Sequence, residues 1–229
     1  MKIANSGQEL IEICKEEQIT LSEYAIRKEI ESKGISREDL FVQMKYTLDA
    51  MREGATLGRE KKVYSLSGLI GGDAYRLQQY SQSGKSLMGA GIITAMAMAM
   101  SSSEVNGSMG KIVACPTAGS CGILPAVILT TGELLNKTDD ELITGLFAAS
   151  AIGMIIGMNA TFSGAEGGCQ AECGSAAAMA AGAVVELMGG TPKMSLDAAA
   201  IILKNVLGLV CDPVAGLVEI PCAKRNVSG

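Results

Sequence analysis

Charged and apolar residues alternate at helical spacing through the first quarter of the chain. In residues 6–33 and again in 36–57, apolar side chains recur every three or four positions among Glu, Lys and Arg. This periodicity predicts amphipathic helices that form a helical layer over residues 1–58. The candidate boundary residues are Asn5, Thr20 and Ser36 at helix starts, and Gly34, Gly54 and Gly58 at helix ends.

Long apolar stretches without a polar face follow, beginning near residue 86. They are 86–100, 123–135, 142–158 and 176–188. The longest, 142–158, lies at the lower margin of the roughly 17–25 residues that a transmembrane helix requires. Few positive charges flank it. We therefore expect buried helices of a soluble bundle, with a membrane-embedded module as the alternative.

Short polar segments rich in Gly, Ser, Thr, Asn and Cys separate these apolar stretches. They are 101–111, 115–122, 159–175 and 211–226. Polar loops between buried helices are where binding sites usually form. The pattern predicts an all-α fold, a compact bundle of buried helices rich in small residues with Gly/Ser/Cys-rich site loops. We expect a single domain over 1–229, with the site-bearing core in 59–229.

Composition narrows the class of protein. The chain of 229 residues is 48% hydrophobic but only 3% aromatic, so its core must be packed mainly from small and aliphatic side chains. Its 19 basic residues are scattered and outnumbered by 24 acidic ones, so we expect no nucleic-acid partner. The N-terminus lacks the apolar core of a signal peptide, which favours a cytoplasmic protein with reduced thiols.

The seven cysteines are the most informative residues, because the chain contains no His to serve as a metal ligand or general base. Cys14 falls on an amphipathic helix and is interpreted as a core residue, whereas the other six lie in or beside the polar segments. Cys169 and Cys173 are four positions apart where an Ala-rich helix begins. The dipole of that helix would favour a thiolate at its N-terminus.

Cys211 precedes Asp212 and Pro213, and Cys222 follows Pro221. Pro213 and Pro221 restrict the backbone there, which predicts rigid loops rather than a helix. Thiolates without imidazole favour an iron–sulfur cluster, zinc or Cu(I). A cluster with three protein thiolates would keep one iron open as a Lewis acid. The residues alone do not select the ligands among six thiols, and ordinary buried cysteines are the alternative.

The segment 115–122, CPTAGSCG, precedes a predicted helix from Ile123. The hydroxyls of Thr117 and Ser120, with the backbone N–H groups near Gly119 and Gly122, would suit a carboxylate. An ordinary N-cap and tight turn is the alternative. Three further polar residues, Glu104, Asn106 and Glu166, would either line a site or lie in solvated loops, and spacing assigns none of them a proton-transfer role.

Four motifs resemble the alpha chain of bacterial iron–sulfur-dependent L-serine dehydratase. They are SSSEVNGSMG, CPTAGSCGILPAV, SGAEGGCQAECGSA and CDPVAGLVEIPCAKRN, and the resemblance covers most of residues 60–226. It implies that Cys169, Cys211 and Cys222 hold a [4Fe–4S] cluster, which leaves Cys173, Cys115 and Cys121 as non-ligands. The substrate-binding residues that it implies are Asn106, Thr117, Ala118, Gly119, Ser120, Ser163, Gly164, Ala165 and Glu166.

The resemblance further implies a lyase of amino-acid catabolism and gluconeogenesis that converts L-serine to pyruvate and ammonia. Because such proteins carry a beta domain or a separate beta chain, we expect a beta-subunit partner, a hetero-oligomer, and a general base supplied by that partner. Relatives continue beyond the KRN motif, so we expect a C-terminal truncation at Gly229. The competing functions are a non-catalytic zinc- or cluster-binding subunit and a pyridoxal-phosphate dehydratase that uses Lys111.

Overall fold

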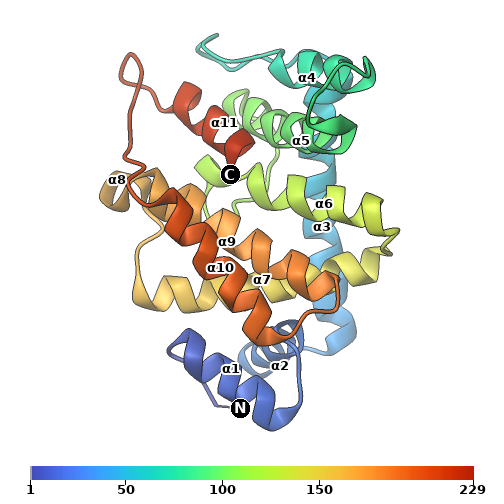
Figure 1. Ribbon diagram of the computed structural model, residues 1–229, viewed down its shortest axis with the longest axis vertical. Helices are drawn as coiled ribbons and strands as arrows, with labels where there is room; N and C mark the ends of the chain where they lie inside the picture. Colours follow the sequence, from blue (N-terminus) through green and yellow to red (C-terminus); the bar gives the residue numbers. More distant parts are fainter. Residues whose placement is uncertain (1) are drawn as a thin grey trace.

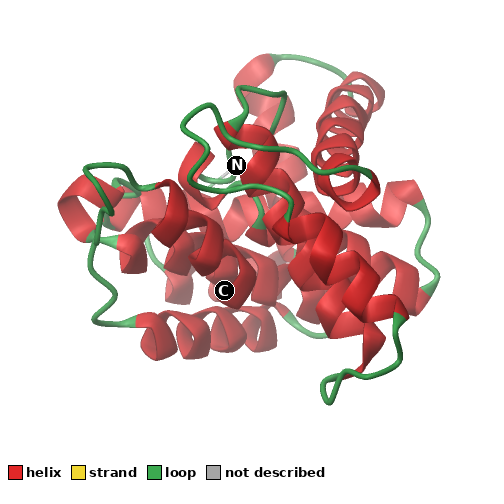
Figure 2. Cartoon of the chain, turned by 90° about the horizontal axis from the view of Figure 1, so that it is seen from above, coloured by secondary structure: helices red, strands yellow, loops and turns green. Residues whose placement is uncertain are grey.

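The computed structural model describes residues 2–229, and 71% of the chain is helical. This confirms the predicted all-α fold, and within the described residues helices joined by loops are the only regular elements (Figure 2). The elements are α1 (Gly7–Glu17), α2 (Leu21–Lys33), α3 (Arg37–Glu60), α4 (Asp73–Gln82), α5 (Gly89–Gly107), the 3₁₀ turn η1 (Ala118–Ser120), α6 (Ile123–Leu135), α7 (Asp139–Asn159), α8 (Gly164–Gly167), α9 (Cys169–Leu187), α10 (Pro192–Val206) and α11 (Glu219–Ser228).

Helices α7, α9 and α10 cross the middle of the molecule (Figure 1). Helices α1 and α2 pack at the end that holds the N-terminus, and α4, α5 and α11 lie at the opposite end. Helix α3 runs along the bundle and connects the two ends, contacting α2, α7 and α5. This arrangement brings the C-terminal helix α11 against α5 and η1, where the polar segments meet.

The N-terminal layer forms as predicted, with changes at its boundaries. Thr20 and Ser36 are N-caps whose hydroxyls accept hydrogen bonds from Glu23 and Asp39 backbone N–H groups. The predicted cap at Asn5 is wrong, because Ser6 caps α1. Gly34 ends α2 with a φ of 64°, a conformation that glycine adopts without strain.

Gly54 and Gly58 do not end a helix, contrary to prediction, because α3 continues through both to Glu60. At Gly58 the two helices α3 and α5 approach closely. A Cβ there would lie 3.1 Å from Cα of Ser101, and the Gly58 N–H donates to the Ser101 hydroxyl at 2.8 Å. Gly58 therefore allows the two helices to pack closely. The sequence pattern, in which glycine usually marks a helix end, does not reveal this role.

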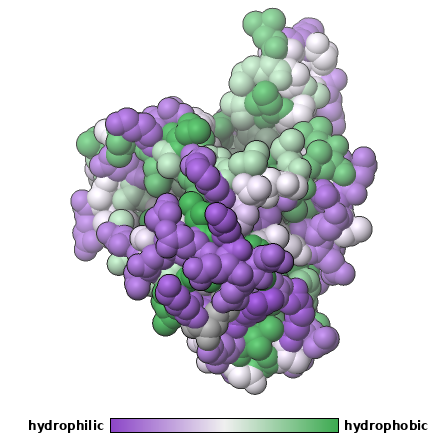
Figure 3. Space-filling view, turned by 60° about the horizontal axis from the view of Figure 1, so that its bottom comes forward, coloured by the Kyte–Doolittle hydropathy of each residue, from purple (hydrophilic) through white to green (hydrophobic). Residues whose placement is uncertain are grey.

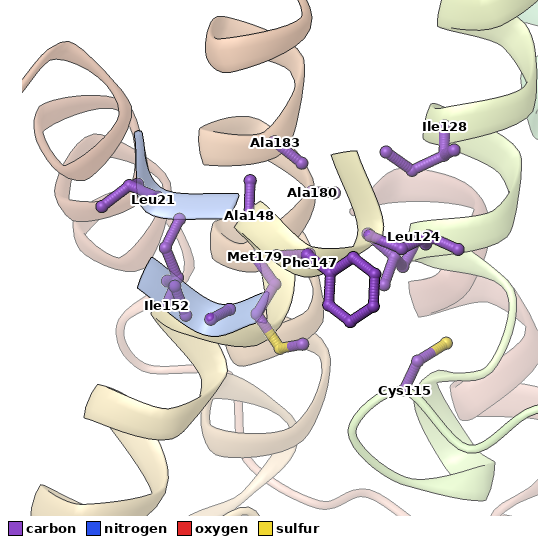
Figure 4. Close-up of a cluster of buried hydrophobic side chains, with 14 of the residues drawn as sticks. Leu21, Cys115, Leu124, Ile128, Phe147, Ala148, Ile152, Met179, Ala180 and Ala183 are labelled. Carbon is purple, nitrogen blue, oxygen red and sulfur yellow. The ribbon is translucent and has the colours of Figure 1, made fainter. Parts of the chain in front are cut away.

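The core is centred on Phe147 of α7, which is buried with 1% of its surface exposed. Its ring lies beside Leu124 of α6, and Met179 of α9 lies near it (Figure 4). Phe147 also faces Phe41 of α3, with ring centroids 5.7 Å apart. Each large buried side chain of this kind stabilises the fold by about 1.5–3 kcal/mol through apolar burial. The core thus joins residues of 1–58 to those of 59–229.

Segment 101–111 was predicted to be a loop, but α5 continues through it to Gly107. The hydroxyls of Ser102 and Ser103 donate to the carbonyls of Met98 and Ala99, one turn earlier in the same helix, at 3.3 and 3.1 Å. Such bonds let serines remain in a buried helix without unpaired polar groups. The serine cluster therefore has the composition of a loop but folds as a helix.

Two stretches, Ala118–Leu135 and Asp139–Asn159, are apolar and long enough to cross a membrane. In each, 56% of the most apolar window is buried inside the protein, as in core helices of soluble proteins. On the face drawn in Figure 3, hydrophilic residues cover most of the central area and hydrophobic ones are scattered between them. These features agree with the predicted soluble bundle.

Candidate functional site

Cys169 begins α9, as the sequence predicted for the start of the Ala-rich helix. The residue before it, Gly168, has a φ of 79°, and a Cβ there would lie 2.6 Å from the carbonyl oxygen of Leu209. The N–H of Gln170 donates to the same carbonyl at 3.0 Å. The start of α9 is therefore joined directly to the loop 207–218, which carries Cys211.

Arg225 of α11 ties that loop to the third element. Its guanidinium donates to the Val210 carbonyl at 2.9 Å and pairs with Asp212 at 3.0 Å, on either side of Cys211. Its guanidinium also lies close enough to the Cys169 thiol to oppose the rise that burial causes in the pKa of that thiol. One cationic side chain thus contacts the surroundings of two of the three predicted cluster ligands.

The third predicted ligand, Cys222, lies on α11 rather than in the predicted loop. Pro221 is the third residue of that helix, where its missing N–H breaks no helical hydrogen bond. Proline was therefore wrongly interpreted as a signal against helix at this position. Cys211 is exposed in the loop 207–218, as predicted, whereas Cys169 is buried.

The electrostatics of the three thiols show that they share one neighbourhood. Burial raises the pKa of Cys222 to about 12, and the charges of Glu172, Cys169 and Cys211 add to that rise. Burial also raises the pKa of Cys169, while the nearby Arg225 guanidinium acts in the opposite direction. Protonated thiols must lose their protons to become metal ligands, so metal binding here would release protons.

The donor chemistry of this neighbourhood fits a [4Fe–4S] cluster, because it offers three thiols and a cation that offsets thiolate charge. Over residues 2–229, however, no three Cys, Asp or Glu side chains are already close enough to hold a metal ion. Cys211 is exposed in the loop 207–218, whereas the other two cysteines sit on helices.

A small cavity connects Cys222 to predicted substrate residues. It has a volume of about 90 Å³ and is lined in part by Asn106, Ala118, Gly119 and Cys222. That volume corresponds to about three water molecules at roughly 30 Å³ each. Asn106 donates to the Ala118 carbonyl at 3.0 Å and so fixes the end of α5 against η1. Three of the nine predicted substrate residues thus line one cavity with a predicted cluster ligand.

The segment 115–122 forms the predicted turn, but not every group in it is available. The hydroxyls of Thr117 and Ser120 bond to each other at 3.1 Å, and Ser120 is fully buried. Gly122 donates its N–H to Asn226. The N–H groups of Ala118 and Gly119, at the start of η1, have no acceptor within the 3₁₀ turn. They are the donors that this segment offers to a carboxylate.

The predicted residues around Ser163 lie partly apart from this cavity. Ala165 and Glu166 in α8 are exposed, and Glu166 accepts a hydrogen bond from Thr161 at 2.8 Å. Ser163 and Gly164 are half-buried, and Gly164 lies against Glu172 of α9. The structure therefore brings Gly164, but not Glu166, toward the segment 115–122.

Several residues of the site or its surroundings were missed by the sequence analysis. Glu172 stands one helical turn after Cys169, and this spacing could have marked it as a site residue. Arg225 and Asn226 reach the site only through tertiary contacts, which the sequence does not indicate. Glu104 is fully buried rather than solvated, and Lys111 is exposed and lies 3.8 Å from Glu53. The position of Lys111 gives no support to a cofactor-binding lysine.

The remaining cysteines are buried. Cys14 lies in the core, as predicted. Burial raises the pKa of Cys121 to about 12 and also raises the pKa of Cys115 and Cys173. Thiols in such surroundings are weakly reactive.

Comparison with known proteins identifies the family. The family model for the serine dehydratase alpha chain matches residues 16–229. The chain is 52% identical over 222 residues to the probable L-serine dehydratase alpha chain of Bacillus subtilis, covering 97% of this chain and 74% of that one. It is 46% identical over 225 residues to the L-serine dehydratase alpha chain of Peptoniphilus asaccharolyticus, covering 98% and 77%.

A third relative, the L-serine dehydratase of Mycobacterium tuberculosis, is 37% identical over 238 residues, which cover 96% of this chain but 49% of that longer one. The family model and the matches to the Bacillus and Peptoniphilus alpha chains extend over nearly the whole chain. They agree with the family that the motifs at the cavity and around the three cysteines indicate. The chain belongs to the serine dehydratase alpha chain family.

Proposed function

We propose that this chain is the alpha chain of an L-serine dehydratase that converts L-serine to pyruvate and ammonia in the cytoplasm. The observation that carries the proposal is the cavity in which Cys222 meets Asn106, Ala118 and Gly119. There a predicted cluster ligand adjoins the backbone donors that would bind a substrate carboxylate. The names of the alpha-chain relatives support the substrate and a separate beta chain.

In this proposal Cys169, Cys211 and Cys222 hold a [4Fe–4S] cluster. When bound, the cluster supplies a Lewis-acidic iron for the substrate β-hydroxyl group. The N–H groups of Ala118 and Gly119 bind the substrate carboxylate, and Asn106 keeps η1 in place through its bond to Ala118. Loss of water gives aminoacrylate, whose imine form takes up water and releases ammonia to leave pyruvate.

The α-proton must be removed by a base, and this chain offers no imidazole. Glu104 is fully buried, and Glu166 is exposed on α8. Neither lines the cavity that contains Cys222, and Glu219, an acid that does, already accepts a hydrogen bond from the Ser67 hydroxyl at 2.6 Å. We therefore assign the base to the beta chain, which would make the active site complete only in the hetero-oligomer.

The test is anaerobic reconstitution of the alpha chain with iron and sulfide, followed by addition of the beta chain. Because the proposed cofactor is a [4Fe–4S] cluster, we expect about four iron and four sulfide per alpha chain. We also expect L-serine-dependent pyruvate formation that requires both chains. D-serine is the matched control substrate. Protein that binds zinc without sulfide, or a loaded complex that forms no pyruvate, would contradict the proposal.

A further inference from the structure

Glu172 lies between the two segments that the sequence analysis assigned to substrate binding. Its carboxylate accepts a hydrogen bond from the Thr117 hydroxyl. A Cβ on Gly119 would lie 2.9 Å from Cδ of Glu172, and a Cβ on Gly164 would lie 2.7 Å from its Oε2. Glycine at both positions therefore leaves the room that this carboxylate occupies. Loops distant in sequence converge on one half-buried acid.

The carboxylate faces thiols and hydroxyls rather than a basic side chain. Its charge contributes to the raised pKa values of Cys121, Cys169, Cys173 and Cys222. Arg225, whose charge acts on Cys173 and Cys222 as well, pairs with Asp212. Among the ion pairs of residues 2–229, none includes Glu172. A half-buried carboxylate without a cation is unfavourable, so this position favours a ligand that carries positive charge.

Glu172 is also correctly placed relative to the other groups of the proposed site. It follows Cys169 by one turn on α9, so both side chains lie on the same side of that helix. Its hydrogen-bond partner Thr117 directly precedes Ala118 and Gly119, whose N–H groups are the proposed carboxylate donors. An amino acid bound there would have its ammonium group next to its own carboxylate, and thus close to Glu172.

We propose that Glu172 binds the α-ammonium group of the amino-acid substrate. This inference rests on the proposed function, because it places serine in the cavity beside η1. Glu172 does not itself line that cavity, but its carboxylate lies against Gly119, which does. It makes Glu172 a specificity-determining residue. Amino acids with a free ammonium group gain a charge-assisted hydrogen bond that the corresponding hydroxy acids cannot form. A residue that only supported the loop 115–122 would not distinguish these two ligand classes.

The experiment uses the anaerobically reconstituted complex with its beta chain and compares wild type with Glu172→Gln and Glu172→Asp. Two ligands test the ammonium group and the hydroxyl group of the substrate independently. L-Alanine keeps the ammonium group but lacks the hydroxyl, and 3-hydroxypropanoate keeps the hydroxyl but lacks the ammonium. The dissociation constant of L-alanine is measured by calorimetry, which needs no turnover. Inhibition by 3-hydroxypropanoate and the KM of L-serine are measured by pyruvate formation.

We expect Glu172→Gln to weaken L-alanine binding and to raise the KM of L-serine by at least about tenfold, the typical loss for a charged hydrogen bond. Inhibition by 3-hydroxypropanoate should change by less than about twofold, and Glu172→Asp should recover part of the L-alanine affinity. The matched control is Glu133→Gln, an exposed acid on α6, which should behave as wild type. Iron and sulfide content should be equal in all four proteins.

Equal weakening of both ligands, or of neither, would overturn the role of Glu172 while the wild type still forms pyruvate from L-serine. Loss of iron and sulfide in Glu172→Gln alone would also overturn this role, because it would show that Glu172 positions the cluster cysteines instead of binding the substrate. A loaded wild-type complex that neither binds nor converts L-serine would instead overturn the proposed function, and the inference with it.

Discussion

Asn226 accepts a hydrogen bond from the backbone N–H of Gly122 at 2.7 Å, although 104 positions separate the two residues. The same buried amide donates to the carbonyls of Gly119 and Cys222 at 2.6 and 2.8 Å. One side chain therefore joins α11 to the turn that precedes α6. Through this contact the position of Cys222 depends on that of Gly119, across the cavity that they share.

Replacement of Asn226 by Ala should destabilise the protein by about 2–4 kcal/mol. The Gly122 N–H and the Gly119 carbonyl would both lose a partner in a buried region, and each such loss costs about 1–3 kcal/mol. The free energy of unfolding from urea denaturation measures the effect. Lys224→Ala, at an exposed position on the same helix, should stay within about 0.5 kcal/mol of wild type. Similar losses in both variants would contradict the argument.

Glu104 should make stability depend on pH. Its Oε1 accepts hydrogen bonds from the N–H groups of Asp73 and Ala74 at 2.6 and 3.2 Å, at the start of α4. Burial raises the pKa of this carboxyl from about 4.5 to about 7. Between these values the folded state holds a proton that the unfolded state has lost. Stability therefore falls as pH rises through this window, by roughly 3 kcal/mol at most, and the contribution present at low pH is lost above the folded pKa.

Glu104→Gln should remove this dependence, because the amide does not ionise. Urea denaturation at pH 5 and pH 8 should show that the variant gains stability relative to wild type at the higher pH. Glu16→Gln, on the exposed face of α1, controls for the general loss of one acid. If the stability difference between wild type and Glu104→Gln is the same at both pH values, the buried carboxyl does not control this titration.

The helices were predictable where hydrophobic length alone decides the structure. The stretch 123–135 coincides with α6, and the apolar segments 142–158 and 176–188 lie within α7 and largely within α9. Helix boundaries were predicted wrongly where tertiary packing or a local side-chain hydrogen bond allows a residue typical of loops to lie inside a helix. Gly58 permits close helix packing, and Ser103 bonds within α5 instead of forming a loop.

The site was predictable in part for a similar reason. Cys169 could be placed at a helix start because the Ala-rich pattern after it is local. The spacing of Glu172 from Cys169 could have marked it as a site residue, but the contacts of Glu172 and Asn226 could not be assigned, because their partners Thr117 and Gly122 are 55 and 104 positions away. Local spacing contains no information on which loops the bundle brings together. The fold supplies that information through the packing of α9 and α11 around η1.

Gly122 should be much less tolerant of a side chain than Gly91. A Cβ at Gly122 would lie 3.0 Å from the carbonyl carbon of Ala99 and equally close to Oδ1 of Asn226. Because a backbone group cannot move aside cheaply, Gly122→Ala should cost about 1–3 kcal/mol. Gly91→Ala, in α5 with nothing within 4 Å, should be neutral or stabilise by up to about 1 kcal/mol. Thermal unfolding of the two variants measures the contrast, and equal effects would contradict the close approach.

Cys211 and Cys173 provide the sharpest test of the cluster ligands. Cys211 is exposed in the loop 207–218, so Cys211→Ser should leave the free energy of unfolding of the apoprotein within about 0.5 kcal/mol of wild type. After anaerobic reconstitution it should nevertheless lose most iron and sulfide, since only two of the proposed thiolates remain.

Cys173 is buried one turn after Cys169 and is not a proposed ligand. Cys173→Ala should therefore keep iron and sulfide at the wild-type ratio, even if the lost sulfur atom lowers stability by about 1 kcal/mol. Iron and acid-labile sulfide per folded chain are measured in both variants, because that ratio separates ligand loss from partial unfolding. Cluster retention in Cys211→Ser, or its loss in Cys173→Ala, would show that the thiols of this bundle are assigned wrongly.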